Sequence, residues 1–195
     1  MKKWVSFVAL IALLTSCLNS FKKDAEKKEV NPADFNEIVI NNEYSMMIPK
    51  YMSKSTKLND EASLQYQNLF KEAYIVVIDE PKEEFIKTFK GLDSYNDSIS
   101  VIQNYRTIQL GMIRENAKIE SQSQPIPMKI DGREAEQVEM VAEIEGVHGK
   151  IYYLLTCIEG VNKVYMVMAW TLENRKNKLR PDYSYAISSF KCLEK

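Results

Sequence analysis

QVEMVAEIE (137–145), KIYYLLTCI (150–158) and KVYMVMAWT (163–171) are the three stretches that decide the fold of this chain. In the first, apolar residues alternate with polar ones, which is the pattern of a strand with one buried face. The other two are almost continuously apolar, as in strands that lie inside a sheet. Short turns containing glycine separate the three stretches, so the sequence predicts an antiparallel meander.

The N-terminal half is predicted to supply further strands. Alternating or β-branched runs bounded by turn residues mark four of them. They are residues 35–40, 44–48, 63–70 and 73–78. Residues 118–131 contain Pro125 and Pro127, and they cannot be a central strand throughout because proline has no N–H to donate to the ladder.

Three helices are expected beside the sheet. The first opens at Pro81 and stops at Gly91, and the last covers residues 182–190. The middle helix is predicted for residues 98–117, with one apolar stripe at helical spacing. This stripe consists of Val101, Tyr105, Ile108 and Met112. The sequence therefore predicts an α+β domain, an antiparallel β-sheet flanked by helices.

Composition places the chain among single-domain globular proteins. It has 195 residues, of which 45% are hydrophobic and 27% charged, with a formal net charge of −1. These values exclude collagen-like and wholly disordered chains. Since nucleic-acid binders carry a basic excess, no nucleic-acid partner is expected.

The N-terminus has the three parts of a signal peptide. Lys2 and Lys3 precede an apolar run of eleven residues, 4–14 (WVSFVALIALL), which is too short to span a bilayer as a helix. The next residues, LTSC (14–17), resemble the lipobox of bacterial lipoproteins. In that family the cysteine thiol takes a diacylglycerol, a peptidase cuts before the cysteine, and the new amino group is usually acylated too. The alternative is an ordinary secretory peptide or short membrane anchor with an incidental cysteine.

The lipobox resemblance implies the organisation of the whole chain. Residues 1–16 would be the signal peptide, with cleavage between Ser16 and Cys17 and lipid attachment on Cys17. Residues 17–31 are polar with mixed charge, as in a tether. Residues 32–195 would form the globular domain. The protein would sit in the cell envelope, facing the periplasm or the outside. Leu18 occupies the place where an aspartate would resemble an inner-membrane retention signal, so we favour the outer membrane.

Short motifs along residues 35–192 resemble the PsbP/DcrB-like family. They are Met47-Ile48-Pro49, DGREA (131–135), the strand 165–170 and ISSF (187–190). The chain departs from the family at Lys50-Tyr51, where a Gly-Trp pair often follows the proline. The resemblance implies a PsbP-like α/β/α sandwich. Such domains are generally non-catalytic and bind other proteins, which is an inference from fold to function.

Residues with catalytic or metal-binding chemistry are few, and none is expected to act as a catalytic, cofactor or metal site. His148 is the only histidine and is predicted to be a solvated hairpin residue. Glu139, Glu143 and Glu145 are expected on a solvated strand face. A basic cluster before Pro181 is predicted to be a solvated loop. It consists of Arg175, Lys176, Lys178 and Arg180. No phosphate-binding, dinucleotide-binding or hydrolase motif is present.

Cys157 and Cys192 leave two alternatives open. They could form a disulfide in an oxidising compartment, or Cys157 could be a buried free thiol and Cys192 an exposed one. Sequence spacing does not decide between these, because a disulfide requires specific geometry.

The sequence thus favours a lipid-anchored envelope protein whose domain binds another envelope protein, which the sequence does not identify. The expected binding surface is formed by the loops 50–62 and 91–98. The alternative is a small-ligand carrier or an enzyme that uses a cleft between helix and sheet. A pocket of a few hundred Å³ with convergent polar groups would favour this alternative.

Overall fold

The computed structural model describes residues 29–194, so Ser16 and Cys17 lie outside the described part of the chain. A large sheet contains β3 (Ser53–Lys54), β4 (Ala62–Asn68), β5 (Ala73–Pro81), β6 (Lys118–Gln122), β7 (Ile126–Ile130), β8 (Arg133–Glu143), β9 (Ile151–Glu159) and β10 (Lys163–Leu172). A small sheet contains β1 (Phe35–Ile40), β2 (Tyr44–Pro49) and β11 (Lys191–Cys192). The helices are α1 (Lys82–Gly91), α2 (Val101–Asn116) and α3 (Lys176–Ser188), with 3-10 turns η1 (Pro32–Asp34) and η2 (Glu173–Arg175).

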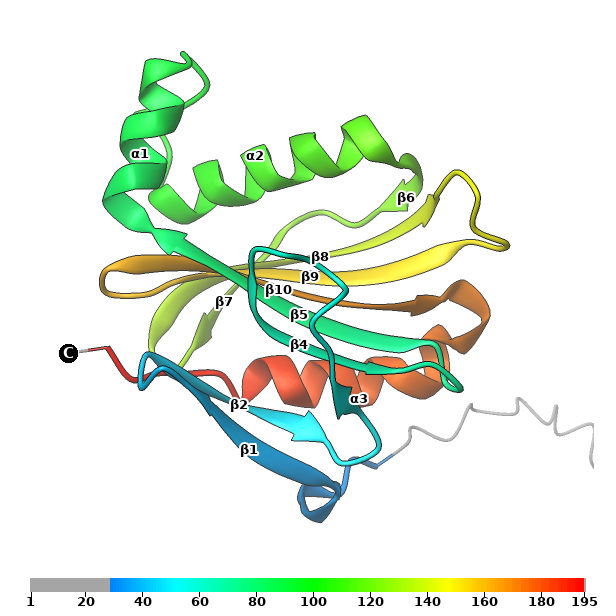
Figure 1. Cartoon of the computed structure of the whole chain (residues 1–195). Helices are drawn as coiled ribbons and strands as arrows, with labels where there is room; N and C mark the ends of the chain where they lie inside the picture. Colours follow the sequence, from blue (N-terminus) through cyan, green and yellow to red (C-terminus); the bar gives the residue numbers. More distant parts are fainter. Residues whose placement is uncertain (1–28, 195) are drawn as a thin grey trace, which may run out of the picture.

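The large sheet has eight antiparallel strands in the order β3-β4-β5-β10-β9-β8-β6, with β7 also paired to β8. Helices α1 and α2 lie on one face, and α3 and the small sheet lie on the other (Figure 1). The predicted α+β fold, an antiparallel sheet flanked by helices, is confirmed. The meander β8-β9-β10 is also present, and β9 and β10 are central strands.

Because β9 and β10 are apolar on both sides, the sheet carries two cores. On the α2 side, Leu155 and Cys157 of β9 pack with Phe85 and Tyr105 of the helices. On the α3 side, the core is built from strands, α3 and the small sheet. Its largest fully buried side chains are Tyr44, Met46, Ile48, Leu64, Ile75, Tyr152, Tyr165, Tyr183 and Phe190.

Two strand predictions are refined by the structure. Residues 118–131 form β6 and β7, both paired to β8, and so confirm that no central strand runs through Pro125 and Pro127. The strand predicted for residues 63–70 was too long, because β4 ends at Asn68. Leu69 and Phe70 lie instead in the turn to β5, and both are exposed.

The last helix begins six residues earlier than predicted, so the basic cluster is not a solvated loop. Lys176 and Arg180 lie in α3, and both pair with Glu139 of β8, at 2.8 and 2.5 Å. Pro181 stands inside the helix, where it removes one main-chain hydrogen bond. Burial of Leu179 and the ion pairs with Glu139 hold the first turns in place despite this loss.

The apolar stripe of α2 is also partly wrong. A capping box of Ser100 and Gln103 starts this helix, and Tyr105 is fully buried as expected. Met112, however, is 44% exposed, whereas Leu110 is only 2% exposed. The helix therefore turns Leu110 toward the sheet at its C-terminal end.

We predict that Leu110→Ala lowers the free energy of unfolding by about 2–5 kcal/mol, the usual cost of emptying a buried leucine site. Met112→Ala should change it by less than about 0.5 kcal/mol, as is usual for surface positions. Chemical denaturation followed by circular dichroism measures both values. Equal losses in the two variants would contradict the orientation of α2.

Candidate functional site

Three connections meet at one end of the large sheet, which we call the aromatic end. They are turn 69–72 between β4 and β5, hairpin 144–150 between β8 and β9, and η2 after β10 (right side of Figure 1). Arg175 of η2 donates a hydrogen bond to the carbonyl of Phe70 at 2.9 Å and pairs with Glu72 at 3.2 Å. The N–H of Glu173 donates to the carbonyl of Lys150 at 2.8 Å. These bonds join the three connections into one surface.

A row of aromatic rings crosses three strands at this end. Trp170 of β10 lies opposite Tyr74 of β5 on one side and Tyr153 of β9 on the other. The Tyr74 and Trp170 rings stack with centroids 5.1 Å apart, and the Tyr153 ring is 6.4 Å from that of Trp170. The row is on the α2 side of the sheet, but α2 packs on β8 and β9 and α1 packs at the opposite end of β5 (Figure 1). The row is therefore left at the surface.

These rings form the floor of a groove of about 470 Å³, the aromatic groove. Hairpin 144–150 supplies one wall with Val147 and His148, and Glu72 lies at the other side. Burial raises the pKa of Tyr74 and of Tyr153, and the nearby Glu72 carboxylate adds to the rise for Tyr74. Both phenols therefore stay protonated at neutral pH, and each can donate one hydrogen bond. The groove is lined by apolar and polar groups in similar measure.

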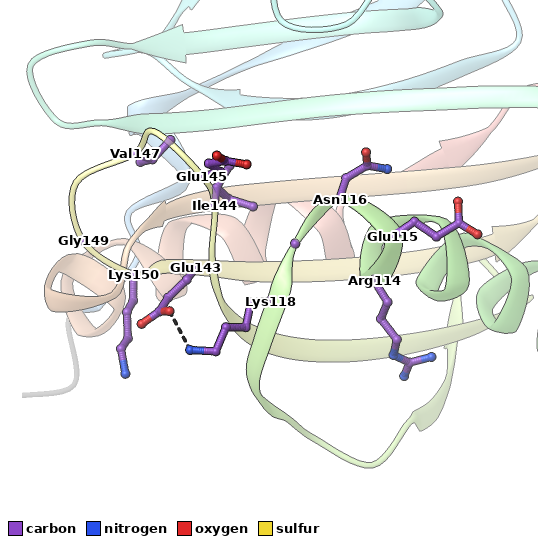
Figure 2. A pocket seen from close by; sticks show the side chains of 11 residues that line it. Arg114, Glu115, Asn116, Lys118, Glu143, Ile144, Glu145, Val147, Gly149 and Lys150 are labelled. Carbon is purple, nitrogen blue, oxygen red and sulfur yellow. Dashed lines mark hydrogen bonds and ion pairs between the residues drawn. The ribbon is translucent and has the colours of Figure 1, made fainter.

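The second side of the same hairpin borders a larger and more open groove of about 950 Å³, the charged groove. Lys118 pairs with Glu143 at 2.9 Å and with Glu120 at 3.0 Å, and Lys150 pairs with Glu120 at 3.1 Å. Figure 2 shows Lys118 and Glu143 pointing toward each other, while Arg114 projects from the end of α2. The hydrogen bonds that Lys118 donates to Glu143 and Glu120 raise its pKa. These charged side chains are therefore paired with one another and do not converge on a shared point where a ligand could bind.

The acidic residues singled out in the sequence do not gather. Glu139 lies under α3, where burial alone would raise its pKa, but the hydrogen bonds from Arg180 and Lys176 lower it. Glu143 pairs with Lys118, and Glu145 lies in the wall of the charged groove. Across residues 29–194, no three histidine, cysteine or acidic side chains are placed to hold a metal ion.

Of the predicted surface loops, 50–62 is partly packed rather than free. Met52 and Ser55 are buried, and the Gln65 side chain accepts hydrogen bonds from the N–H groups of Leu58 and Asn59. Loop 91–98 follows the C-terminal end of α1, on the other side of the molecule from hairpin 144–150 (Figure 1). His148 is exposed as predicted, but its place beside the aromatic row was not foreseen.

Cys157 and Cys192 are both free thiols, so the structure does not contain the disulfide that was one of the two alternatives. Cys157 lies in the core on the α2 side, and Cys192 packs against the core on the α3 side. The large sheet separates them. Burial is the main cause of the raised pKa of the Cys157 thiol, which makes it a poor nucleophile because the thiolate is the reactive form.

Comparison with solved structures identifies the fold. No family model matches this chain, and a search of curated proteins finds no relative. The solution structure of cyanobacterial PsbP (CyanoP) from Synechocystis sp. PCC 6803 is similar with a TM-score of 0.55 and 14% identity, over 92% of this chain and 98% of that one. LpqN, described as involved in cell envelope biogenesis of Mycobacterium tuberculosis, is similar with a TM-score of 0.53 and 10% identity, over 80% and 90%. The chain thus has the PsbP-like fold that its motifs predicted.

We predict that thiol-specific reagents distinguish the two cysteines. In the native protein Cys192 should be modified rapidly, whereas Cys157 should react only after denaturant is added, because its thiol is buried and protonated. Peptide mapping by mass spectrometry gives the extent of modification at each residue. A disulfide-linked peptide containing both cysteines would contradict the structure.

Proposed function

We propose that this protein is a cell-envelope lipoprotein whose α+β domain binds another envelope component without catalysing a reaction. Acyl chains on Cys17 would hold it to the membrane, with the outer membrane favoured. The binding site would be the aromatic groove with hairpin 144–150. The observation that carries the proposal is the row of Tyr74, Trp170 and Tyr153, which is only partly buried and lines the aromatic groove.

The sequence supports the anchor, and one structural neighbour supports a role in the envelope. The order of lysines, apolar run and LTSC is that of a lipoprotein signal. None of the helices in residues 29–194 is both long and apolar enough to cross a bilayer. LpqN, which has the same fold, is described as involved in cell envelope biogenesis, and an envelope role is proposed here by analogy.

A binding role agrees with how the ionisable groups near the grooves are arranged. Catalytic groups are held within hydrogen-bond reach of a shared reacting point. Here Lys118, Glu143 and Lys150 are engaged in ion pairs with neighbouring strands. Large aromatic side chains, in contrast, supply much of the binding energy in protein interfaces.

The second candidate is a small-ligand carrier, which the groove volumes favour. Cavities that bind small molecules have volumes of roughly 300–1,000 Å³, and the two grooves measure about 470 and 950 Å³. A carrier would hold its ligand in the aromatic groove and would need no protein partner there.

We predict that Cys17→Ser abolishes acylation, because the hydroxyl cannot form the thioether. In the host of origin, mass spectrometry of the unchanged protein should show an acylated N-terminal peptide that begins at Cys17. Cys192→Ser is the matched control and should leave that peptide unchanged. An unchanged protein that keeps Met1, or carries no lipid at position 17, would contradict the anchor.

We predict that a photo-crosslinking residue at Val147, in the wall of the aromatic groove, captures one defined envelope component in living cells. The same residue at Leu92, which is exposed at the C-terminal end of α1, should not. Trp170→Ala should reduce the yield at position 147 several-fold, with circular dichroism confirming the fold. Equal crosslinking at both positions would contradict the site. A co-purifying small molecule that Trp170→Ala loses would instead support the carrier.

A further inference from the structure

Turn 69–72 presents two consecutive large apolar side chains to the outside. Leu69 is 64% exposed, and Phe70, at 96%, is the most exposed large apolar side chain in residues 29–194. The turn is well held, because the Asn68 side chain accepts a hydrogen bond from the N–H of Lys71 at 2.8 Å and Arg175 binds the carbonyl of Phe70. Exposed turns are usually built from small polar residues, so a turn that holds Leu69 and Phe70 outward requires an explanation.

The same turn lies beside the point where the described chain begins. The Asn68 side chain donates a hydrogen bond to the carbonyl of Tyr51 at 2.6 Å, and the Lys71 ammonium sits 4.9 Å from the centre of the Tyr51 ring. Tyr51 in turn lines a small cavity together with Glu29 and Asn31. The first described residues and turn 69–72 therefore share one corner of the molecule.

The chain between Cys17 and Glu29 is short. Residues 18–28 number eleven, and a fully extended chain of that length spans at most about 40 Å. If Cys17 carries acyl chains, the corner that holds Glu29 cannot move farther than this from the membrane. A tether attached at this corner therefore lets turn 69–72 reach the lipid surface.

The chemistry of the corner fits a lipid surface. Leu69 and Phe70 supply apolar side chains and Lys71 supplies a cation beside them, while Arg175 is paired with Glu72 of the same turn. Apolar tips next to basic residues bind at the boundary between headgroups and acyl chains. Tyrosine and tryptophan are enriched at the same depth, and the row that contains Tyr74 and Trp170 follows directly after the turn.

We propose that turn 69–72 inserts Leu69 and Phe70 into the interface of the membrane to which Cys17 is anchored. This inference rests on the proposed lipid anchor and adds a second contact, which fixes how the domain stands on the bilayer. The aromatic groove then opens next to the membrane surface. An acyl anchor alone would not set the orientation of the domain, whereas a second contact at turn 69–72 would restrict it.

Leu69→Trp and Leu92→Trp form a matched pair of probes, because both leucines are 64% exposed, Leu69 in the turn after β4 and Leu92 at the C-terminal end of α1. This turn and α1 lie on opposite sides of the molecule (Figure 1). The full lipoprotein is incorporated into vesicles of phosphatidylethanolamine and phosphatidylglycerol, with and without bromine on the acyl chains. Bromine quenches tryptophan that lies in the lipid, and the unchanged protein gives the background from Trp170. Mass spectrometry of the same sample reports acylation of Cys17.

We expect the emission of Leu69→Trp to shift to the blue and to be quenched by brominated lipid, while that of Leu92→Trp is not. Adding Phe70→Ser to Leu69→Trp should reduce the quenching, and circular dichroism should show an unchanged fold.

If Cys17 is acylated and Leu69→Trp is not quenched, the membrane contact is wrong and the anchor stands. Quenching without acylation would sustain the contact and refute the anchor. Equal quenching of both probes would overturn the contact. A blue shift that occurs without lipid and grows with protein concentration would also overturn it, and would indicate that Leu69 and Phe70 contact a second copy of the chain.

Discussion

The whole structure depends on one constraint: the two central strands are apolar on both faces, so neither face of the sheet can be left to water. β9 is buried along almost its whole length, and β10 carries buried side chains on both sides. Burying this surface is the dominant favourable contribution to folding. The segments before and after the meander therefore become its two covers, with α1 and α2 on one face and α3 and the small sheet on the other.

The cover on the α2 side is incomplete, and this creates the candidate site. α2 lies along β8 and β9, and α1 packs where β5 ends. The remaining corner, at the start of β5 and the end of β10, is closed by side chains alone. Tyr74, Trp170 and Tyr153 suit that corner because each has a large apolar body and a polar atom that can remain in contact with water. The groove thus follows from how two short helices fit on a sheet of eight strands.

Much of the fold could be predicted because its signals are local. Period-two alternation in 137–145 and the apolar runs after it indicate the meander without any knowledge of the partners of these strands. The start of α3 could not be predicted, because Pro181 and four basic residues indicate a loop. The ion pairs of Lys176 and Arg180 with Glu139, which help to hold this turn of the helix, join positions about 40 apart in sequence and leave no local signal. Met112 was wrongly assigned to the apolar stripe of α2 for a related reason. Regular spacing shows which residues share a face of the helix, but only the position of the sheet decides which of them are buried.

The candidate site was beyond sequence reasoning because it depends on register. Tyr74, Tyr153 and Trp170 all lie in strands that were predicted, and alternation within each strand could have assigned its two faces. Their meeting requires that Trp170 stand opposite both tyrosines, and a shift of one residue would send a ring to the other face. CyanoP and LpqN show that the same fold occurs in proteins that share few residues with this one, so the fold does not determine the ligand. Under the proposed function, the ligand is therefore selected by the side chains that this chain's own register brings together, which are the aromatic row and the hairpin wall beside it.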